Sequence, residues 1–241
     1  MLTPAFWPEV RRGTERMVHE LSTGLIARGH RPVVVTSHAG GPGRGVEAGV
    51  SVIRMPRPPS GRLRRRRIED HIPHVPLSYA ALRAGRYDVA HAWYSTDSLA
   101  AGRWGRATRR PAVQSYMGIP DVEGLRYRRW RLGITLRSIE ACDVTVALSR
   151  HAADAFRSCL GYEAPVIPPP VDVHTFTPAE TRTEQPTFVC AAALEEERKR
   201  GDLLVRAFAR VRRDRPGARL LLNRPHDSCL LYTSPSPRDR S

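Results

Sequence analysis

Lysine, paired cysteines and long apolar runs are all scarce in this sequence. Lys199 is the only lysine among 39 basic residues, and the formal net charge is +15. An arginine bias of this kind, together with much alanine, glycine and proline, indicates GC-rich coding as much as function. The positive charge attracts anionic lipids, nucleotides and polyphosphates, but it does not choose among them.

No apolar run approaches the roughly 18 residues that a membrane-spanning helix needs, and no charged segment followed by a long apolar one stands at the N-terminus. The four cysteines show no C-x-x-C pairing, so the sequence predicts neither a zinc site nor a disulfide framework. They are Cys142, Cys159, Cys190 and Cys229. We therefore expect a cytoplasmic protein.

Two signatures of nucleotide recognition are also missing. No G-x-G-x-x-G run follows the first predicted strand, which argues against an ordinary dinucleotide-binding domain. No helix-turn-helix, RNA-binding signature or clustered surface aromatic residues accompany the charge. The sequence therefore argues against a nucleic-acid partner.

The first 37 residues predict a loop, an amphipathic helix and a buried strand. Thr14 is a good N-cap, and apolar residues recur at helical spacing from Met17 to Ile26 until Gly29 ends the helix. The preceding loop carries Gly13, which lets backbone N–H groups approach an anion at the helix N-terminus. The same glycine also fits an ordinary turn into the helix, and the local sequence leaves both interpretations open.

Strands and helices alternate through the rest of the chain, which is typical of a doubly wound parallel sheet. Strands are predicted at 32–35, 50–55, 87–94, 111–116 and 143–148, helices at 77–84, 98–106, 126–141 and 149–159, and a glycine-rich loop at 38–49. A second alternation follows, with a strand at 187–191, a helix at 202–213 and a strand at 218–222. We expect a first domain at 1–177, a linker at 178–186 and an incomplete second domain at 187–225.

Residues 62–67 are five arginines and one leucine. This run fits a dock for an anionic membrane or a phosphorylated acceptor, and it also fits a solvated loop and helix start, which charge runs usually are. The helix predicted at 126–141 interleaves arginines with apolar residues, including Trp130, and packs on the core or faces a membrane. Nearby, Asp70, His71 and His74 suggest a metal site, although two prolines disturb the spacing that would bring the histidines together.

The order of these segments resembles the family 4 glycosyltransferases of the GT-B fold, over nearly the whole chain up to about Pro225. The phrases that carry the likeness are GTERMVHELSTGLIARGHRPVVVTS, YDVAHAW, ACDVTVALS, VIPPPVDVHTFTP and RKRGDLLVRAFARVRRDRPGARLLL. The resemblance implies an α/β protein of GT-B type. Its N-terminal domain is a Rossmann-like, doubly wound parallel sheet, and the start of a second Rossmann-like domain follows.

The resemblance also implies donor contacts. Gly13 matches the second glycine of the family's G-G-x-E loop, which meets the donor phosphates, and Glu15 matches its acid. Arg12 replaces the first glycine and can supply a phosphate contact of its own. Three basic residues fall near the family's phosphate-binding lysine, namely Arg198, Lys199 and Arg200.

On the loop or acceptor side the resemblance implies Glu15, His91, Tyr94 and Gly118. His91 matches the first histidine of the family's D-V-V-H-A-H strand, where a structural duty is expected of it. Met117 occupies the position at which many members carry a functional histidine. A thioether cannot exchange a proton, so the catalytic residue is left unassigned.

These matches imply a glycosyltransferase that moves a sugar from a nucleotide-sugar donor, its substrate, to a sugar, lipid-linked or small-molecule acceptor. The family resemblance implies retention of configuration, no metal and no separate cofactor, because basic side chains and a helix N-terminus neutralise the leaving diphosphate. Peripheral contact with an anionic membrane at its inner face is a further expectation. The alternative is a non-enzymatic α/β module that holds anionic lipid or another polyanion through its arginines.

The two ends depart from the family. Met1 falls partway through the family's first strand, and the family's donor domain continues well past residue 225. Residues 226–241 resemble a translated cloning adapter and are left out of the fold prediction. We therefore expect this chain to be a truncated, inactive form of an active parent enzyme.

Overall fold

The computed structural model describes residues 1–222, with gaps at Arg11, Ser60, Asp70, Asp172, His174, Thr175, Ala179, Arg182, Ala193, 195–198 and the side chain of Arg64. The predicted tail at 226–241 lies outside the described residues. The chain divides into two compact units, residues 1–172 and 173–241. No helix in the described part is long and apolar enough to cross a membrane.

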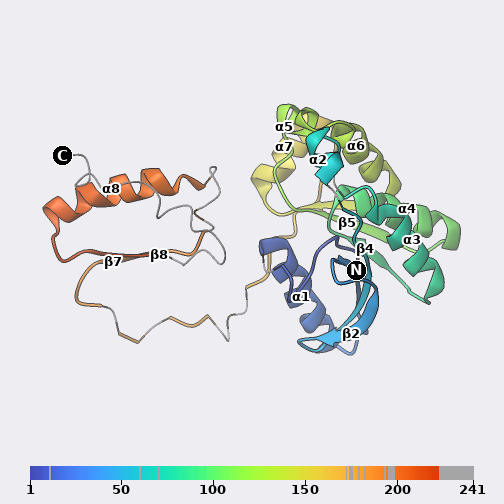
Figure 1. Ribbon diagram of the computed structural model, residues 1–241, viewed down its shortest axis with the longest axis horizontal. Coiled ribbons are helices and arrows are strands. Elements are labelled where there is room, and N and C mark those ends of the chain that lie inside the picture. The colour runs from blue at the N-terminus through green and yellow to red at the C-terminus, as the bar shows by residue number, and fades with distance from the viewer. Residues whose placement is uncertain are drawn as a thin grey trace. The chain divides into compact units, whose positions relative to one another are not determined.

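The first unit contains two three-stranded sheets with the strand orders β2-β3-β1 and β4-β5-β6, of which β2, β4 and β5 are labelled in Figure 1. The two halves meet at Leu2, which forms parallel bridges to Val35 of β1 and Ala92 of β4. All neighbours are parallel except β2, which runs antiparallel to β3. The strands are β1 Val33–His38, β2 Gly43–Glu47, β3 Val50–Pro56, β4 Ala90–Ala92, β5 Ala112–Tyr116 and β6 Val144–Ala147.

Successive residues of β1 show that helices cover both faces of its sheet. Val34 packs in a cluster with Val18 of α1 (Gly13–Ile26). Val35 packs in another cluster with Leu82 of α3 (His74–Ala84) and Trp104 of α4 (Ser95–Thr108). Because neighbouring side chains of a strand point to opposite faces, α1 lies on one face and α3 and α4 on the other. The predicted doubly wound α/β architecture is confirmed.

Four more helices complete the first unit: α2 Gly61–Arg65, α5 Val122–Tyr127, α6 Arg131–Ala141 and α7 Arg150–Leu160. Ser149 caps α7 as its sequence predicts, since its Oγ accepts a hydrogen bond from Ala152 N at 3.1 Å. The second unit contains β7 Thr187–Cys190, α8 Gly201–Asp214 and β8 Arg219–Leu222, with the two strands parallel. This β-α-β step is the one predicted from the sequence.

The start of α1 differs from the prediction. The helix begins at Gly13 with Arg12 as its N-cap, so Thr14 lies inside the first turn instead of capping it. Glu15 closes the turn, because its Oε2 accepts a hydrogen bond from Arg12 N at 3.2 Å. A glutamate three residues after the N-cap commonly makes this contact, and it outweighed the capping preference of Thr14.

The single helix predicted at 126–141 is wrong, because α5 and α6 are separate helices. Asp121 Oδ2 accepts a hydrogen bond from Gly124 N at 2.7 Å, which starts α5 upstream of the prediction. Arg129 N donates a hydrogen bond to Arg67 O at 2.6 Å, so this N–H group does not make the intrahelical bond that a continuous helix would need. Trp130 then adopts a left-handed conformation with φ 68° before α6 begins. Trp130 is exposed, not part of an apolar helix face.

Two further predictions are corrected. The glycine-rich loop expected at 38–49 contains β2, an edge strand whose sequence has little apolar alternation and whose pairing with β3 is decided by tertiary contact. The strand expected at 87–94 is only Ala90–Ala92, because only these three residues pair with β5. The helix α4 starts at Ser95, three residues earlier than predicted.

Two glycines in neighbouring helices give opposite stability predictions. A Cβ on Gly102 of α4 would lie 2.4 Å from Ala141 O and 2.6 Å from Ala141 Cβ, whereas a Cβ on Gly133 of α6 would meet nothing within 4 Å. Gly102→Ala is expected to lower the free energy of unfolding by about 1–2 kcal/mol through overpacking. Gly133→Ala is expected to raise it by about 0.5–1 kcal/mol, because alanine loses less backbone entropy in a helix. Urea titration of both variants measures the two signs, and a stabilised Gly102→Ala would show that α4 and α6 pack less closely.

Candidate functional site

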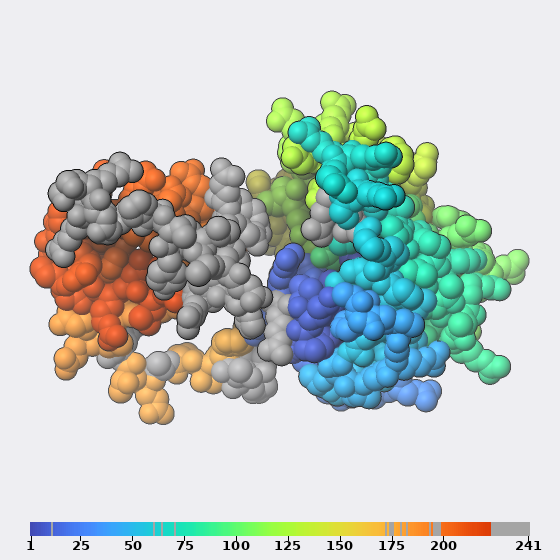
Figure 2. Space-filling view, in the orientation of Figure 1, coloured from blue at the N-terminus to red at the C-terminus, as the bar shows by residue number. Residues whose placement is uncertain are grey.

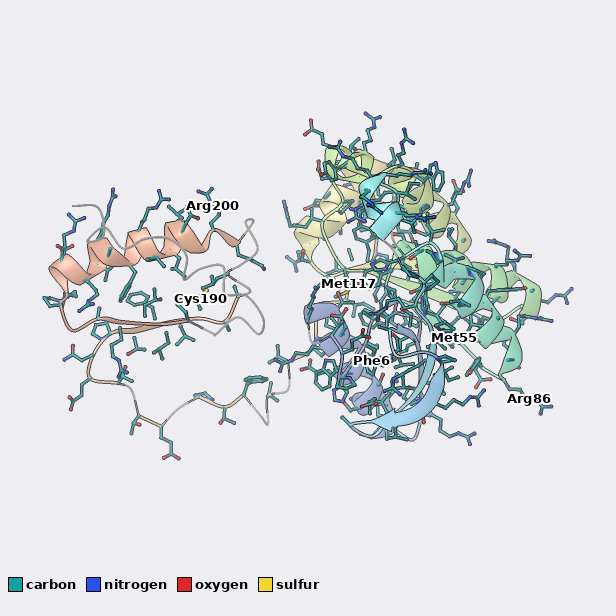
Figure 3. The ribbon with its side chains drawn as sticks, viewed as in Figure 1. Phe6, Met55, Arg86, Met117, Cys190 and Arg200 are labelled. Atoms are coloured by element: carbon teal, nitrogen blue, oxygen red, sulfur yellow. The ribbon has the colours of Figure 1, made fainter. Side chains whose placement is uncertain are left out.

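A pocket of about 850 Å³ lies at the carboxyl-terminal edge of β4 and β5 in the first unit. Its walls come from the start of α1, the segments after β4 and β5, and the α5–α6 region. In an open α/β sheet this edge is where ligands bind. The residues that line it include Arg12, Thr14, Trp93, Tyr94, Met117 and Gly118. Met117 lies beside α1 in Figure 3.

The loop that leads into α1 is anchored by Arg57. Its Nη1 and Nη2 contact Glu9 Oε1 and Oε2 at 2.6 and 2.8 Å, a bidentate pair. Nη2 also donates to Ser37 O at 2.7 Å, at the end of β1. The loop is therefore held against the carboxyl-terminal edge of the sheet, and the start of α1 is held with it.

Gly13 is the first residue of α1, and a Cβ added there would meet no atom within 4 Å. Nothing in the fold itself thus requires a glycine at this position. The first backbone N–H groups of a helix lack intrahelical partners, and the helix dipole favours negative charge there. Arg12, whose side chain is exposed, adds a positive charge to the same end of the pocket. The arrangement can bind an anion such as a phosphate.

Glu15 is a buried residue of the helix start. Its carboxylate accepts the Arg12 N–H described above, and burial raises its pKa above the ordinary value. Its geometry therefore gives it a part in positioning the loop that carries Arg12 and Gly13. The acceptor-side role implied by the family resemblance stays a prediction.

His91 lies inside β4, with its ring stacked on Trp93 at a centroid distance of 4.8 Å. Its Nε2 is 2.9 Å from Ser115 Oγ on the neighbouring strand β5. Burial lowers the pKa of His91 to about 4, so the ring is neutral at physiological pH. These contacts join two strands below the pocket, which fits a structural duty.

The lowered pKa of His91 predicts a loss of stability in acid. The folded pKa of about 4 lies below the value of 6.5 for a free histidine, so the folded protein binds fewer protons than the unfolded chain between these pH values. The stability that the neutral, buried His91 ring contributes is fully present above pH 6.5 and is lost as the pH falls toward 4. We expect His91→Asn to remove about 2 kcal/mol of this pH dependence, measured by urea unfolding at neutral pH and near pH 4. His151→Asn, at an exposed histidine of α7, is the control, and an unchanged slope in His91→Asn would contradict the prediction.

Tyr94, Met117 and Gly118 line the pocket together. Burial raises the pKa of Tyr94 to about 12, so its hydroxyl keeps its proton, and its ring meets His71 edge-on at 5.1 Å. Met117 also packs against the apolar cluster that contains Phe6 and Val18. The first two residues after β5 are therefore a thioether and a glycine, neither of which has a side chain able to transfer a proton. Farther along the same wall, Asp121, which caps α5, also lines the pocket.

One wall of the pocket was missed by the sequence prediction. Arg131 Nε donates to Glu69 Oε2 at 2.6 Å, and both residues line the pocket together with Arg128. The two partners are 62 residues apart in sequence. No local pattern pairs them, since Glu69 follows the arginine run and Arg131 begins α6. Their contact gives the pocket a polar, basic side.

The basic residues of the predicted donor-phosphate loop belong to the second unit. Lys199 is exposed, and Arg200 is the left-handed N-cap of α8, where Figure 3 labels it. Arg200 Nε is 3.5 Å from Asp202 Oδ1, and the Leu203 backbone N–H is the largest cause that holds the pKa of Asp202 below its usual value. Arg198 lies outside the described residues. The start of α8 thus carries exposed positive charge.

The histidines considered for a metal site have other partners. His74 is buried, with Nδ1 2.7 Å from Asp97 Oδ1, and Ser78 Oγ donates to the same carboxylate oxygen at 3.0 Å. His71 packs on Tyr94, and Asp70 is outside the described residues. Among the residues with described positions, no group of three or more histidine, cysteine, aspartate or glutamate side chains could hold a metal ion.

Comparisons with known proteins agree with this architecture. The family model described as Glycosyltransferase Family 4 matches residues 11–175. Sucrose-phosphate synthase from Thermosynechococcus elongatus is similar in structure, with a TM-score of 0.65, 18% identity and 90% of this chain covered. The Anabaena protein HepE, solved in complex with UDP and glucose, has a TM-score of 0.65, 15% identity and 92% coverage. This chain spans 59% of the length of each structure. The search of curated proteins gave no match.

Proposed function

We propose, because this chain belongs to glycosyltransferase family 4, that the complete protein transfers a sugar from a nucleotide-sugar donor to an acceptor held in the pocket of the first unit. The observation that carries the proposal is the position of Gly13. Gly13 is the first residue of α1 and lies between Arg12 and Thr14, which both line the pocket. An anion is favoured at this helix N-terminus, and a Cβ on Gly13 would meet no atom of the fold within 4 Å. A donor phosphate would explain the glycine, because the absence of a Cβ lets the backbone N–H groups approach the phosphate closely.

In the first unit, Arg12 and the start of α1 are the groups that contact the donor phosphates in this proposal. The phosphate role that the family resemblance implies for Arg198, Lys199 and Arg200 is a separate proposal about the second unit. Basic side chains and a helix N-terminus can neutralise a leaving diphosphate, so the transfer proceeds without a metal. Retention of configuration follows from the family and is proposed with it.

The acceptor occupies the pocket beside Tyr94, Met117 and Gly118. Aromatic rings and arginines are suited to sugars, whose faces are apolar and whose hydroxyls accept and donate hydrogen bonds. A pocket of about 850 Å³ holds a sugar, a small molecule or the head of a lipid-linked acceptor. Met117 has no proton-transfer role in the chemical step, because a thioether cannot give or take a proton.

The 241-residue chain by itself is proposed to be inactive. In its second unit, apolar side chains of the β7-α8-β8 step are exposed, among them Phe188, Val189 and Leu203. Residues of this kind normally lie in a domain core. Activity is therefore assigned to the complete protein.

The test is an assay of the complete protein with UDP-, GDP- and ADP-sugars, beginning with UDP-glucose because the similar HepE structure contains UDP and glucose. We expect slow hydrolysis of one donor without acceptor, unchanged by a metal chelator, and an α-configured product from an α-configured donor. No turnover of any of these donors would overturn the enzymatic proposal. Loss of turnover with the chelator would overturn metal independence alone. Polyanion binding without turnover would favour the non-enzymatic alternative.

A further inference from the structure

Two arginine-rich segments that are far apart in sequence form one surface of the first unit. Ile68, just after α2, makes a parallel bridge to Arg129, and Arg129 N donates to Arg67 O at 2.6 Å. The α2 segment therefore lies against the turn between α5 and α6, as Figures 1 and 2 show. We call this the basic aromatic surface. It consists of Arg62, Arg65, Arg66, Arg67, Arg126, Tyr127, Arg129 and Trp130.

Its two aromatic residues point away from the core. Tyr127 and Trp130 are each 63% exposed. The Arg67 guanidinium lies 5.0 Å from the centre of the Tyr127 ring, a cation–π contact. Both Arg67 and Trp130 have positive φ, at 53° and 68°. Such a conformation is strained for bulky residues and persists where surrounding contacts enforce it, so the exposed tryptophan is held in place by the fold.

The charge of the surface is strongly positive. Its six arginines are all exposed. Among the residues with described positions, the exposed acids beside them are Asp121, which caps α5, and Glu123 in the first turn of α5. Glu69 is buried and paired with Arg131, so it does not offset this charge. Arginines around exposed tryptophan and tyrosine are the combination that binds the headgroup region of an anionic bilayer.

We propose that the basic aromatic surface docks the first unit on an anionic membrane. Arginines attract the anionic headgroups, and Trp130 and Tyr127 enter the interface, where amphipathic rings are favoured. Exposed rings beside arginines also stack on unpaired bases, so single-stranded RNA is the competing ligand that the test includes. This pair of exposed rings corrects the expectation that no clustered surface aromatic residues accompany the charge. Docking on a membrane goes beyond the proposed transfer reaction and does not depend on it.

The surface adjoins the pocket, because residues of the same α5–α6 segment line both. Leu125, Arg128 and Arg131 face the pocket, while Tyr127, Arg129 and Trp130 belong to the surface. Docking would place the pocket beside the lipid headgroups. In combination with the proposed function, and resting on it, this favours a lipid-linked acceptor over a freely soluble one.

Vesicle binding tests the docking without requiring turnover. The complete protein is mixed with vesicles of phosphatidylcholine alone and of phosphatidylcholine with phosphatidylglycerol, and its partitioning is measured by sedimentation. We expect binding only to the anionic vesicles. The double variant Arg62→Gln/Arg66→Gln is expected to bind about 25-fold more weakly, at about fivefold for each arginine. The matched control is Arg83→Gln/Arg86→Gln, two exposed arginines at the end of α3, which should bind as the wild type does.

Tryptophan fluorescence separates insertion from simple charge attraction. Trp93 and Trp104 are buried and Trp7 stacks on His19, so a blue shift on vesicle binding reports on Trp130. Trp130→Phe should keep binding and lose the shift. Trp130→Asn, which tolerates the left-handed backbone, should lose about tenfold in partitioning.

Three outcomes would overturn the proposal. One is equal binding to neutral and anionic vesicles, and another is equal loss in the α2 and α3 double variants. The third is single-stranded RNA binding that is stronger than vesicle binding, which would make the surface a nucleic-acid site. Unchanged thermal unfolding of each variant ensures that a loss of binding is a loss of contact.

Discussion

Asp97→Ala is expected to lower the free energy of unfolding of the first unit by about 3–5 kcal/mol, the usual cost of breaking a buried pair. Asp97 is fully buried in the first turn of α4, where the helix dipole favours an acidic residue. Its Oδ1 contacts His74 Nδ1 at 2.7 Å and accepts from Ser78 Oγ at 3.0 Å. Alanine would leave two buried polar groups of α3 without this partner.

Asp88→Ala is the matched control. The Asp88 side chain is fully exposed and pairs with Arg110 at 3.3 Å, so its removal should change stability by no more than about 0.5 kcal/mol. Urea unfolding followed by fluorescence measures both variants, because Trp104 lies in the buried cluster between these helices and the sheet. A double variant, Asp97→Leu with His74→Phe, should recover part of the loss by removing both polar partners. If Asp97→Ala lost no more than Asp88→Ala, α3 and α4 would be held by apolar contacts alone.

Gly13→Ala is expected to reduce kcat/KM for the nucleotide sugar by about 100-fold in the complete protein while leaving its stability unchanged or slightly raised. In the free protein an added Cβ finds nothing within 4 Å, so the methyl group costs nothing in the fold. With a phosphate at the start of α1, the same methyl group would crowd the closest approach of the backbone to the donor. A 100-fold loss in kcat/KM corresponds to about 3 kcal/mol, which is the size expected when a methyl group is forced into a closely packed contact with the donor.

Gly24→Ala in the same helix is the control for Gly13→Ala. Its Cβ would make an ordinary contact of 3.7 Å with Arg28 Nη1 near the other end of α1. We expect a small gain in stability and unchanged kcat/KM from this substitution. Wild-type activity in Gly13→Ala would remove the phosphate role from Gly13 and leave it an ordinary residue of the turn. The proposed reaction would then need its phosphate contacts from residues other than Gly13.

Much of the architecture could be predicted from the sequence because the signals are local. The apolar run that became β1 places Val34 and Val35 in two different clusters, which is what burial on both faces requires. Ser149 capped α7, and the second β-α-β step formed close to its predicted bounds. The phosphate role of Gly13 stays a prediction, because a glycine at a helix start fits an ordinary turn as well as an anion contact.

The errors occurred where a distant backbone group decided the local structure. Arg129 N bonds to Arg67 O, so a helix that looked continuous in sequence is interrupted at Trp130. The pairing of β2 with β3 made a strand from a glycine-rich segment. The helical pattern of a segment depends only on that segment's own residues. It therefore does not show when a distant backbone group takes one of the segment's N–H groups.

By itself the sequence determined the alternating α/β order, the core faces of its strands and helices, and the family of the chain, because spacing of apolar residues and caps is a local property. Only the tertiary structure decided what surrounds the site. It brought Glu69 to Arg131, buried His74 against Asp97, and set α2 beside the α5–α6 turn with Trp130 exposed. Each of these contacts joins residues more than 20 positions apart, and such pairs depend on how the helices pack on the sheet.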